Sequence, residues 1–449
     1  MWRREKDIKH REGTVIPVKK TVRIVISAAC CGLLAISWLI VINSKSTAEK
    51  QLILIGQAAA LTIDGVYIRA VPLLEEAAGY DSAHTITAEN ELKKVYLALI
   101  GNRGFSRRYT ELLEKQMRRK NVQPDVFTEA ADYYMSTLNT KEALAVLRAG
   151  IEKTGSAELI ALYEDSRYAF EVSRTSYESI TGIYNMTAQV QTGGKWGIAD
   201  ADGIIMIPCE YDKISTFHRD RSIVEKDGVI YAVDKDNNRI AVPHETVSDF
   251  GNLADDRIPL LIGEGWYRST GEFERGASVF EDFGMYSEGY AAAKTGGKWG
   301  VIDRSMGWLI PAEYDEIIRD ELGRCYAQGA VFARRGDMVC LFSNGKWMED
   351  VYQDARPFSG EGFAAVRKNG KWGFIDTNGA VMIDFVYDEA LSFGQHLAAV
   401  KNGEFWGYIN MYGNMVIDAA FYDAKSFSDG RAPVLTDRGW QFITLVEYK

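Results

Sequence analysis

The chain of 449 residues has few of the side chains that build most catalytic and metal sites, with only five cysteines and five histidines. The histidines lie at unrelated positions, and Cys209, Cys325 and Cys340 form an odd set without CxxC spacing. This pattern argues against a disulfide framework, a zinc site or a shared general base. GxSxG, HExxH, P-loop, GxGxxG and EF-hand patterns are also absent. We therefore expect a protein that is not an enzyme and that uses no cofactor and no metal.

The charge is unevenly distributed along the chain. The formal net charge is −10, but residues 1–23 carry eight Lys and Arg against three acidic groups, a charge of +5, which leaves −15 on the remainder. Nucleic-acid binding needs clustered Lys and Arg to neutralise phosphates. The acidic body therefore argues against a nucleic-acid partner.

An uncharged apolar run lies at Ile24–Ile42. As a helix it would span about 28 Å of a hydrocarbon layer that is ~30 Å thick. The basic residues of 1–23 would hold the N-terminus in the cytoplasm. The sequence thus predicts a single transmembrane helix in a bacterial cell membrane, with residues 44–449 outside the cytoplasm. A cleaved signal peptide, with a weak cleavage site at Ser44-Lys45-Ser46, remains the alternative.

Residues 47–185 show apolar periodicity near 3.6, which predicts paired helices. Three leucines, Leu74, Leu113 and Leu147, fall at equivalent positions of successive pairs. Their period, in the mid-thirties, indicates stacked helical hairpins, an α-solenoid. The expected helices are Lys50–Ile63, Tyr67–Ala78, Ala88–Ile100, Ser106–Lys120, Val126–Ser136, Lys141–Lys153 and Ala157–Ala169.

One of these hairpins, Ala131–Gly155, resembles a tetratricopeptide repeat, with Lys141-Glu142-Ala143-Leu144 opening its second helix. The resemblance implies a concave surface for a peptide or partner protein. A rigid stalk that only spaces its two ends is the competing interpretation. Pro72 lies within one expected helix and must either occupy its first turn or kink it.

Residues 189–449 repeat one short unit. The motifs GGKWGIADADG at 193–203, GGKWGVIDRSMG at 296–307, NGKWGFIDTNG at 369–379 and EFWGYINMYG at 404–413 share one register. The successive steps between equivalent positions are 34, 36, 33, 39, 34, 34 and 34. The residues at this position are Trp196, Ile230, Trp266, Trp299, Met338, Trp372, Trp406 and Trp440. Eight aligned units predict a repeat domain.

These units resemble the WG-repeat family of bacterial proteins, whose unit runs approximately G-K-W-G-[YF]-I-D-x-x-G-x-x-x-I-P-x-x-Y-D. The resemblance implies binding and assembly and does not imply a known reaction. The structural repeat positions are Trp196, Gly197, Trp299, Gly300, Trp372, Gly373, Trp406 and Gly407, with Tyr211, Tyr314 and Tyr387 at a constant distance after their tryptophans.

The unit is typical of β structure. Asn369-Gly370 is a favoured two-residue hairpin turn between the strands Phe363–Val366 and Lys371–Asp376. A third strand, Val381–Ile383, follows a type I turn. We expect Gly373 to leave room for an aromatic side chain of a neighbouring unit.

Blades of β-propellers usually have four strands and roughly 40–50 residues. The shorter units of this chain fit three strands better. We therefore predict an all-β array that is open or curved, with a closed propeller-like ring as the alternative. One such unit cannot bury its apolar face alone, so neighbours must stack.

Two recurrent polar features suggest ligands. Asp200, Asp303 and Asp376, with Asn410, could line cation sites, but their place in turns already explains them. The Tyr-Asp pairs, such as Tyr387-Asp388, could offer an aromatic ring and an acid to a sugar, although core packing explains the tyrosines better.

Two functions remain in competition. The first is a membrane-anchored scaffold of a bacterial envelope that presents two repeat arrays to partner proteins. The second is cell-wall polysaccharide binding, suggested by 52 aromatic residues and by Gly265-Trp266-Tyr267. The expected segments are 1–23 basic tail, 24–42 transmembrane helix, 47–185 helical domain and 189–449 repeat domain.

Overall fold

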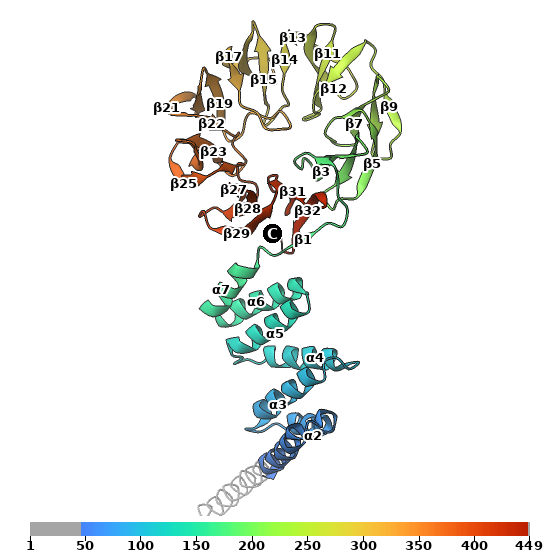
Figure 1. Ribbon diagram of the computed structural model, residues 1–449, viewed down its shortest axis with the longest axis vertical. Coiled ribbons are helices and arrows are strands. Elements are labelled where there is room, and N and C mark those ends of the chain that lie inside the picture. The colour runs from blue at the N-terminus through green and yellow to red at the C-terminus, as the bar shows by residue number, and fades with distance from the viewer. Residues whose placement is uncertain (1–45, 448–449) are drawn as a thin grey trace, which may run out of the picture. The chain divides into compact units, whose positions relative to one another are not determined.

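The computed structural model describes residues 46–447 (Figure 1). The expected transmembrane segment Ile24–Ile42 lies outside this range. Within it, no helix has the length and apolarity needed to cross a membrane. This finding gives no support to the membrane anchor predicted from the sequence or to the extracytoplasmic location inferred from it.

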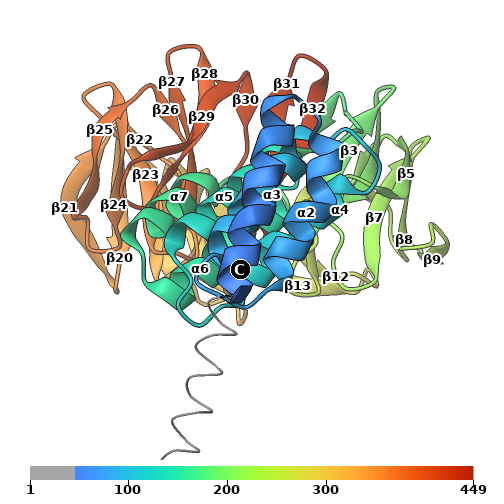
Figure 2. The same ribbon diagram turned by 90° about the horizontal axis from the view of Figure 1, so that it is seen from below.

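The first part of the described chain is helical. Residues 46–63 form a helix, and six more follow: α2 (Tyr67–Gly79), α3 (Thr85–Ala98), α4 (Phe105–Met117), α5 (Pro124–Ser136), α6 (Thr140–Thr154) and α7 (Ala157–Ser166). Each expected helix has a counterpart in this set. Contacts join α2 to α3 and α3 to α4, which lie side by side in Figure 2.

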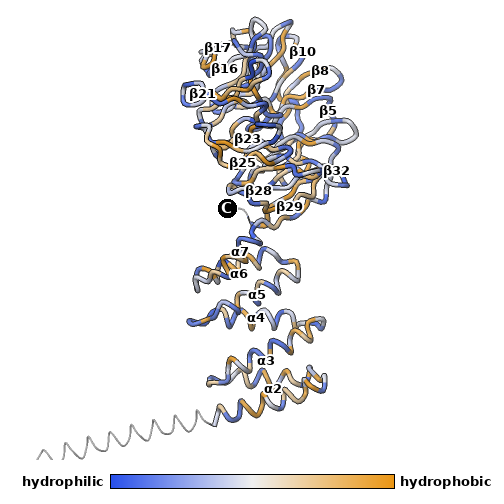
Figure 3. Tube along the Cα trace, turned by 60° about the vertical axis from the view of Figure 1, so that its left-hand side comes forward, coloured by the Kyte–Doolittle hydropathy of each residue, from blue (hydrophilic) through white to orange (hydrophobic). Residues whose placement is uncertain are grey.

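The helices bury one face each, as their periodicity predicts. Leu74, Leu113 and Leu147 are each about 1% exposed. Hydrophobic and hydrophilic stretches alternate along the helices (Figure 3). Pro72 lies inside α2, beyond its first turn. The resemblance of residues 131–155 to a tetratricopeptide repeat stays a prediction.

The rest of the described chain forms eight four-stranded antiparallel sheets arranged as the blades of a closed ring (Figure 1). The predicted open array is therefore wrong, and the fold is an eight-bladed β-propeller. Blade 1 consists of β2 (Ser179–Ile180), β3 (Thr187–Thr192), β4 (Lys195–Asp200) and β5 (Ile205–Tyr211), and blade 2 of β6 (Lys213–Ile214), β7 (Arg221–Lys226), β8 (Val229–Asp234) and β9 (Arg239–Ala241). Blade 3 consists of β10 (Val247–Phe250), β11 (Arg257–Ile262), β12 (Gly265–Thr270) and β13 (Arg275–Phe280), and blade 4 of β14 (Asp282–Phe283), β15 (Tyr290–Thr295), β16 (Lys298–Asp303) and β17 (Trp308–Tyr314).

The second half of the ring repeats this order. Blade 5 consists of β18 (Glu316–Ile317), β19 (Ala330–Arg335), β20 (Met338–Ser343) and β21 (Lys346–Tyr352), and blade 6 of β22 (Asp354–Ala355), β23 (Phe363–Lys368), β24 (Lys371–Asp376) and β25 (Val381–Tyr387). Blade 7 consists of β26 (Glu389–Ala390), β27 (Leu397–Asn402), β28 (Phe405–Asn410) and β29 (Met415–Phe421). Blade 8 consists of β30 (Asp423–Ala424), β31 (Arg431–Thr436) and β32 (Gly439–Leu445), and β1 (Phe170–Val172) is its fourth strand.

Four strands fit into so short a unit because the first strand of a blade is very short. It has two residues in seven of the eight blades, and in six blades a single residue separates it from the outer strand of the preceding blade. In blade 7, for example, only Asp388 separates β25 from β26. A two-residue strand has no alternating hydrophobic pattern, so the periodicity of the sequence does not reveal it.

The ring is closed by a strand from the beginning of the propeller. β1 pairs with β32, with Phe170 opposite Leu445. The amide nitrogen of Ser173 also donates to the carbonyl oxygen of Phe442 at 2.8 Å. The propeller thus begins at Phe170, inside the range expected to be helical.

Candidate functional site

The repeated tryptophan and tyrosine form a pair on neighbouring strands of one blade. Trp372 in β24 lies opposite Tyr387 in β25, and Trp372 is 4% exposed. The same register pairs Trp196 with Tyr211, Trp299 with Tyr314 and Trp406 with Phe421. Directly opposite residues on antiparallel strands are the contacts that stabilise a sheet most. In these four blades the paired residues belong to the hydrophobic core or pack against it.

The glycine after the tryptophan has a different role from the one expected. A Cβ atom on Gly373 would lie 2.7 Å from the carbonyl oxygen of Ile383 in the outer strand of the same blade. On Gly407 it would lie 2.6 Å from the carbonyl oxygen of Ile417, and Gly197 and Gly300 have the same close backbone neighbour. The register shifts between the third and fourth strands at this point. The glycine accommodates a β-bulge of its own blade and makes no room for a neighbouring aromatic ring.

The lysine and the aspartate of the repeat connect neighbouring blades. Lys371 Nζ lies 2.5 Å from Asp388 Oδ1, and Asp388 Oδ2 accepts a hydrogen bond of 2.8 Å from the Gly403 amide in the next blade. The Lys371 ammonium, and then the Gly403 N–H, lower the pKa of Asp388 below its ordinary value. Asp212 and Asp315 repeat this arrangement with Lys195 and Lys298.

These contacts bear on the sugar-binding interpretation of the Tyr-Asp pairs. Tyr211 is 2% exposed and Tyr314 is 8% exposed, so neither ring offers a face to a sugar. Both carboxylate oxygens of Asp388 already have partners.

The recurrent turn acids have backbone partners. Asp376 Oδ1 accepts hydrogen bonds from the amides of Asn378 at 2.8 Å and Ala380 at 2.9 Å. Asp200, Asp303 and Asn410 do the same in their blades. Among residues 46–447, no group of three or more His, Cys, Asp or Glu could hold a metal ion.

The three cysteines in this part of the chain are free thiols. Cys325 is fully buried, and burial raises the pKa of its thiol to about 12. A thiol that stays protonated is a poor nucleophile.

The loop between the first and second strands, here called the AB loop, differs in one blade. The AB loop of blade 5 has twelve residues, 318–329, whereas those of blades 4, 7 and 8 have six. Within it, Asp320 Oδ1 accepts hydrogen bonds from the amides of Leu322 at 3.0 Å and Arg324 at 2.9 Å, and Arg324 Nε donates to Asp320 Oδ2 at 2.6 Å. The insertion is therefore held in a defined turn.

This insertion contacts blades on the other side of the ring. Glu321 Oε1 accepts a hydrogen bond of 2.5 Å from the Gly182 amide of blade 1, and Glu321 Oε2 lies 2.5 Å from Lys425 Nζ of blade 8. The Leu322 carbonyl accepts a hydrogen bond of 3.1 Å from Asn252 Nδ2 of blade 3. The insertion thus extends across the centre of the propeller.

Two cavities lie on either side of the insertion. The larger one, of about 680 Å³, is bordered by the AB loops of blades 4 to 8 and by Gly182 and Ile183 of blade 1. The smaller one, of about 410 Å³, is bordered by blades 2, 3, 4 and 5. Arg319, Asp320 and Glu321 line both. We call the larger one the central cavity.

The central cavity combines aromatic, hydroxyl and charged groups. Phe358, Phe393 and Phe427, which occupy the same position in three successive AB loops, contribute aromatic rings. Its charged residues are Arg319, Arg324, Arg356, Lys425, Glu288, Asp320, Glu321 and Glu361. Four positive and four negative groups give a formally neutral site in an acidic chain.

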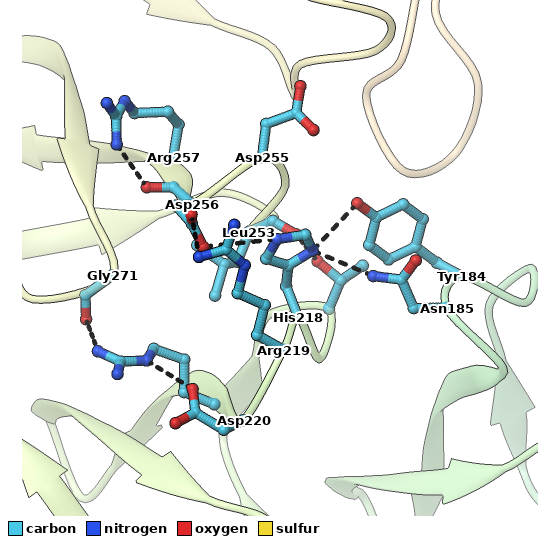
Figure 4. A network of polar contacts seen from close by, with 12 residues as sticks. Tyr184, Asn185, His218, Arg219, Asp220, Leu253, Asp255, Asp256, Arg257 and Gly271 are labelled. Atoms are coloured by element: carbon cyan, nitrogen blue, oxygen red, sulfur yellow. Dashed lines mark hydrogen bonds and ion pairs between the residues drawn. The ribbon is translucent and has the colours of Figure 1, made fainter.

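The AB loops of blades 1, 2 and 3 are joined by a polar network around His218 (Figure 4). Asn185 Nδ2 lies 3.1 Å from His218 Nδ1, and Asp256 Oδ1 lies 3.6 Å from His218 Nε2. Arg219 Nη1 pairs with the other oxygen of Asp256 at 2.6 Å. Side-chain contacts thus connect the AB loops of blades 1, 2 and 3, whereas the central cavity is bordered mainly by the AB loops of blades 4 to 8.

Comparison with known families identifies the repeat. Six segments match the family described as WG containing repeat: residues 196–229, 278–299, 299–320, 343–372, 372–404 and 406–440. The propeller is built from WG repeats. The segments that do not match contain the degenerate copies around Ile230, Trp266 and Met338.

A comparison with curated proteins found no match. Solved structures similar to the WG-repeat propeller include "YCF48 bound to D1 peptide", with 10% identity, a TM-score of 0.34 and coverage of 62% of this chain and 97% of that chain. "YCF48 from Cyanidioschyzon merolae" has 14% identity, a TM-score of 0.31 and coverage of 62% and 98%. The Cps50 (Swd1) β-propeller domain of Myceliophteria thermophila has 10% identity, a TM-score of 0.33 and coverage of 62% and 100%. Similarity this distant indicates no ligand for the WG-repeat propeller.

The residues of the central cavity were not predicted from the sequence. The repeat motif draws attention to Trp, Gly and Tyr, which form the blade cores, whereas the cavity is lined by AB-loop residues that vary between units. One signal was present, since the step from Trp299 to Met338 is the longest in the series. It marks the insertion that carries Arg319 and Glu321.

Proposed function

We propose that this chain is a non-enzymatic binding or scaffold protein, and that its WG-repeat propeller receives a segment of a protein partner in the central cavity. The observation that carries the proposal is that recurrent and non-recurrent residues of the repeat have different roles. The recurrent Trp, Tyr, Lys and Asp residues pack and connect the blades. The non-recurrent AB-loop residues line a concave site.

The size and lining of the central cavity support binding. Ligand sites are concave, with volumes of roughly 300 to 1,000 Å³, and combine apolar walls with a few polar groups. A volume of about 680 Å³ with aromatic rings, hydroxyl groups and both signs of charge meets this description. A peptide segment offers the same mixture of apolar, hydrogen-bonding and charged groups.

The charged groups of the central cavity favour binding over catalysis. Arg324 is paired with Asp320, Lys425 with Glu321, and Arg356 Nη2 with Glu389 at 3.3 Å. Because these charged groups are paired, they are suited to positioning a ligand rather than to transferring a proton. Polysaccharide binding receives less support, because the recurrent rings of the blades are buried.

A site-specific photocrosslinker tests the proposal. Gly360 borders the central cavity, and a Cβ atom there would meet no heavy atom within 4 Å. A photoreactive phenylalanine at Gly360 in the full chain, irradiated in the native host, is expected to give one protease-sensitive adduct. The matched control is the same residue at Tyr412, which is 88% exposed and lies outside the cavity.

Three results are decisive. An adduct from Gly360 but not from Tyr412 supports the proposal. Equal adducts from both positions, or none from Gly360, refute it. An adduct that glycan hydrolases degrade and proteases do not would favour the polysaccharide alternative.

A further inference from the structure

The central cavity contains one positive group that differs from the others. Within residues 46–447, the Arg319 guanidinium has no carboxylate within 4.0 Å, whereas Arg324, Arg356 and Lys425 each have an acidic partner. A guanidinium presents five N–H donors in a planar fork that matches a carboxylate. Arg319 is therefore available to a carboxylate from outside the chain.

The position of Arg319 is fixed by an aromatic ring. Its guanidinium carbon lies 4.0 Å from the centre of the Trp299 ring. Stacking holds the plane of a guanidinium while its N–H edges stay free for hydrogen bonds. An arginine that is already oriented loses less conformational entropy when it binds.

The wall of the same cavity already binds one carboxylate, from the chain itself. Glu321 is held by the Lys425 ammonium and by the Gly182 amide, both at 2.5 Å. It belongs to the same insertion as Arg319 and lies two residues further along. Carboxylate recognition therefore fits the electrostatics of this part of the ring, although the chain as a whole is acidic.

The remaining acids of the cavity do not oppose this interpretation. Glu288 Oε2 accepts a hydrogen bond of 3.0 Å from the Gln328 amide, and Asp320 pairs with Arg324. Glu361 Oε1 accepts one of 2.7 Å from the His396 amide. Its other oxygen, Oε2, is buried without a hydrogen-bond partner in the described part of the chain, 3.9 Å from His396 Nδ1. No acidic residue of the cavity therefore pairs with Arg319 in the described part of the chain.

We propose that the central cavity recognises an acidic peptide segment, in which a carboxylate binds Arg319. A peptide supplies this carboxylate from an Asp or Glu side chain. The inference rests on the proposed function and specifies the chemistry of the partner.

Selection from a random heptapeptide library displayed on phage tests this inference with the full chain as bait. The wild-type protein is expected to enrich peptides rich in Asp and Glu. Arg319→Gln should lose this enrichment and bind the selected peptides about tenfold more weakly, because one charge-assisted interaction is lost. The matched control is Arg275→Gln, since Arg275 also stacks on an aromatic ring, Tyr267, at 4.8 Å but lies outside the cavities.

Thermal melting of both variants separates binding from folding. If Arg319→Gln melts well below the wild type, Arg319→Lys decides instead, because it keeps a cation near Trp299 and loses the planar fork. Selected peptides without excess acid, no enrichment at all, or unchanged affinity in these variants would each overturn the inference. The proposed function is decided separately by the crosslink from Gly360, so the two can fail independently.

Discussion

Replacing Gly373 by alanine tests the β-bulge that shapes every well-formed WG repeat. The new Cβ atom would lie 2.7 Å from the carbonyl oxygen of Ile383 and 3.0 Å from the carbonyl carbon of Asp384. Normal van der Waals contact of a Cβ atom begins near 3.4 Å. The outer strand must therefore move by about 0.7 Å, and it is backbone that must move.

The expected loss of stability follows from this displacement. Forcing an additional methyl group into a packed region costs about 1–3 kcal/mol. For a domain of this size, each kcal/mol lowers Tm by about 2–4 °C. Gly373→Ala should therefore lower the Tm of the propeller by about 2–12 °C.

Tryptophan fluorescence during heating is a suitable assay, because eight of the ten tryptophans lie in the propeller and none in the described helices. The matched control is Gly360→Ala, where nothing lies within 4 Å of the new atom. Its Tm should be unchanged or slightly higher, because alanine has fewer unfolded conformations than glycine. A Gly373→Ala protein that melts like Gly360→Ala would refute the bulge as the reason for this glycine.

Three further perturbations have defined outcomes. Trp372→Ala removes a buried ring and should cost about 3–5 kcal/mol, seen as a lower Tm in the same assay. Asp388→Asn should lower Tm at pH 7. The pKa of Asp388 in the folded protein is below its ordinary 3.8, so its stabilisation is present above pH 3.8 and is lost as the pH falls through the folded value. The Tm values of the variant and the wild type should therefore converge in acid. A difference in Tm between Asp388→Asn and the wild type that did not shrink as the pH fell below 3.8 would contradict this reasoning. Glu321→Gln should lower the free energy of unfolding by about 1 kcal/mol and speed amide hydrogen exchange in residues 319–325. Unchanged exchange in these residues would show that Lys425 and Gly182 do not hold the insertion.

The sequence predicts the helices and strands of this protein better than it predicts the closure of the strands into a ring. The register of Trp196, Trp299, Trp372 and Trp406 defines the units because the ring packs at the same place in each of these four blades. The hairpin at Asn369-Gly370 is confirmed by positive φ angles of 54° and 81° at the two turn residues. The helices are correct to within a few residues, and α2, α3 and α4 each have a stripe of buried residues.

The ring itself could not be predicted from the repeat, because the strands that create it carry no repeat pattern. β1 joins the last sheet through backbone hydrogen bonds, which leave little trace in residue type. The two-residue first strands likewise have no hydrophobic pattern that the sequence could reveal. The central cavity was missed for a related reason, since Arg319 and Glu361 occupy loops in which the units differ from one another.

Closure by β1 also sets the order in which the propeller can be completed during synthesis. β1 ends at Val172, whereas its partner, the last strand of the chain, begins only at Gly439. At about 5–20 residues per second, a ribosome needs roughly 10–60 s to cover the distance between them. For this time the early blades can form while the eighth sheet lacks its partner, and a chain that stops before Gly439 cannot close its ring at all.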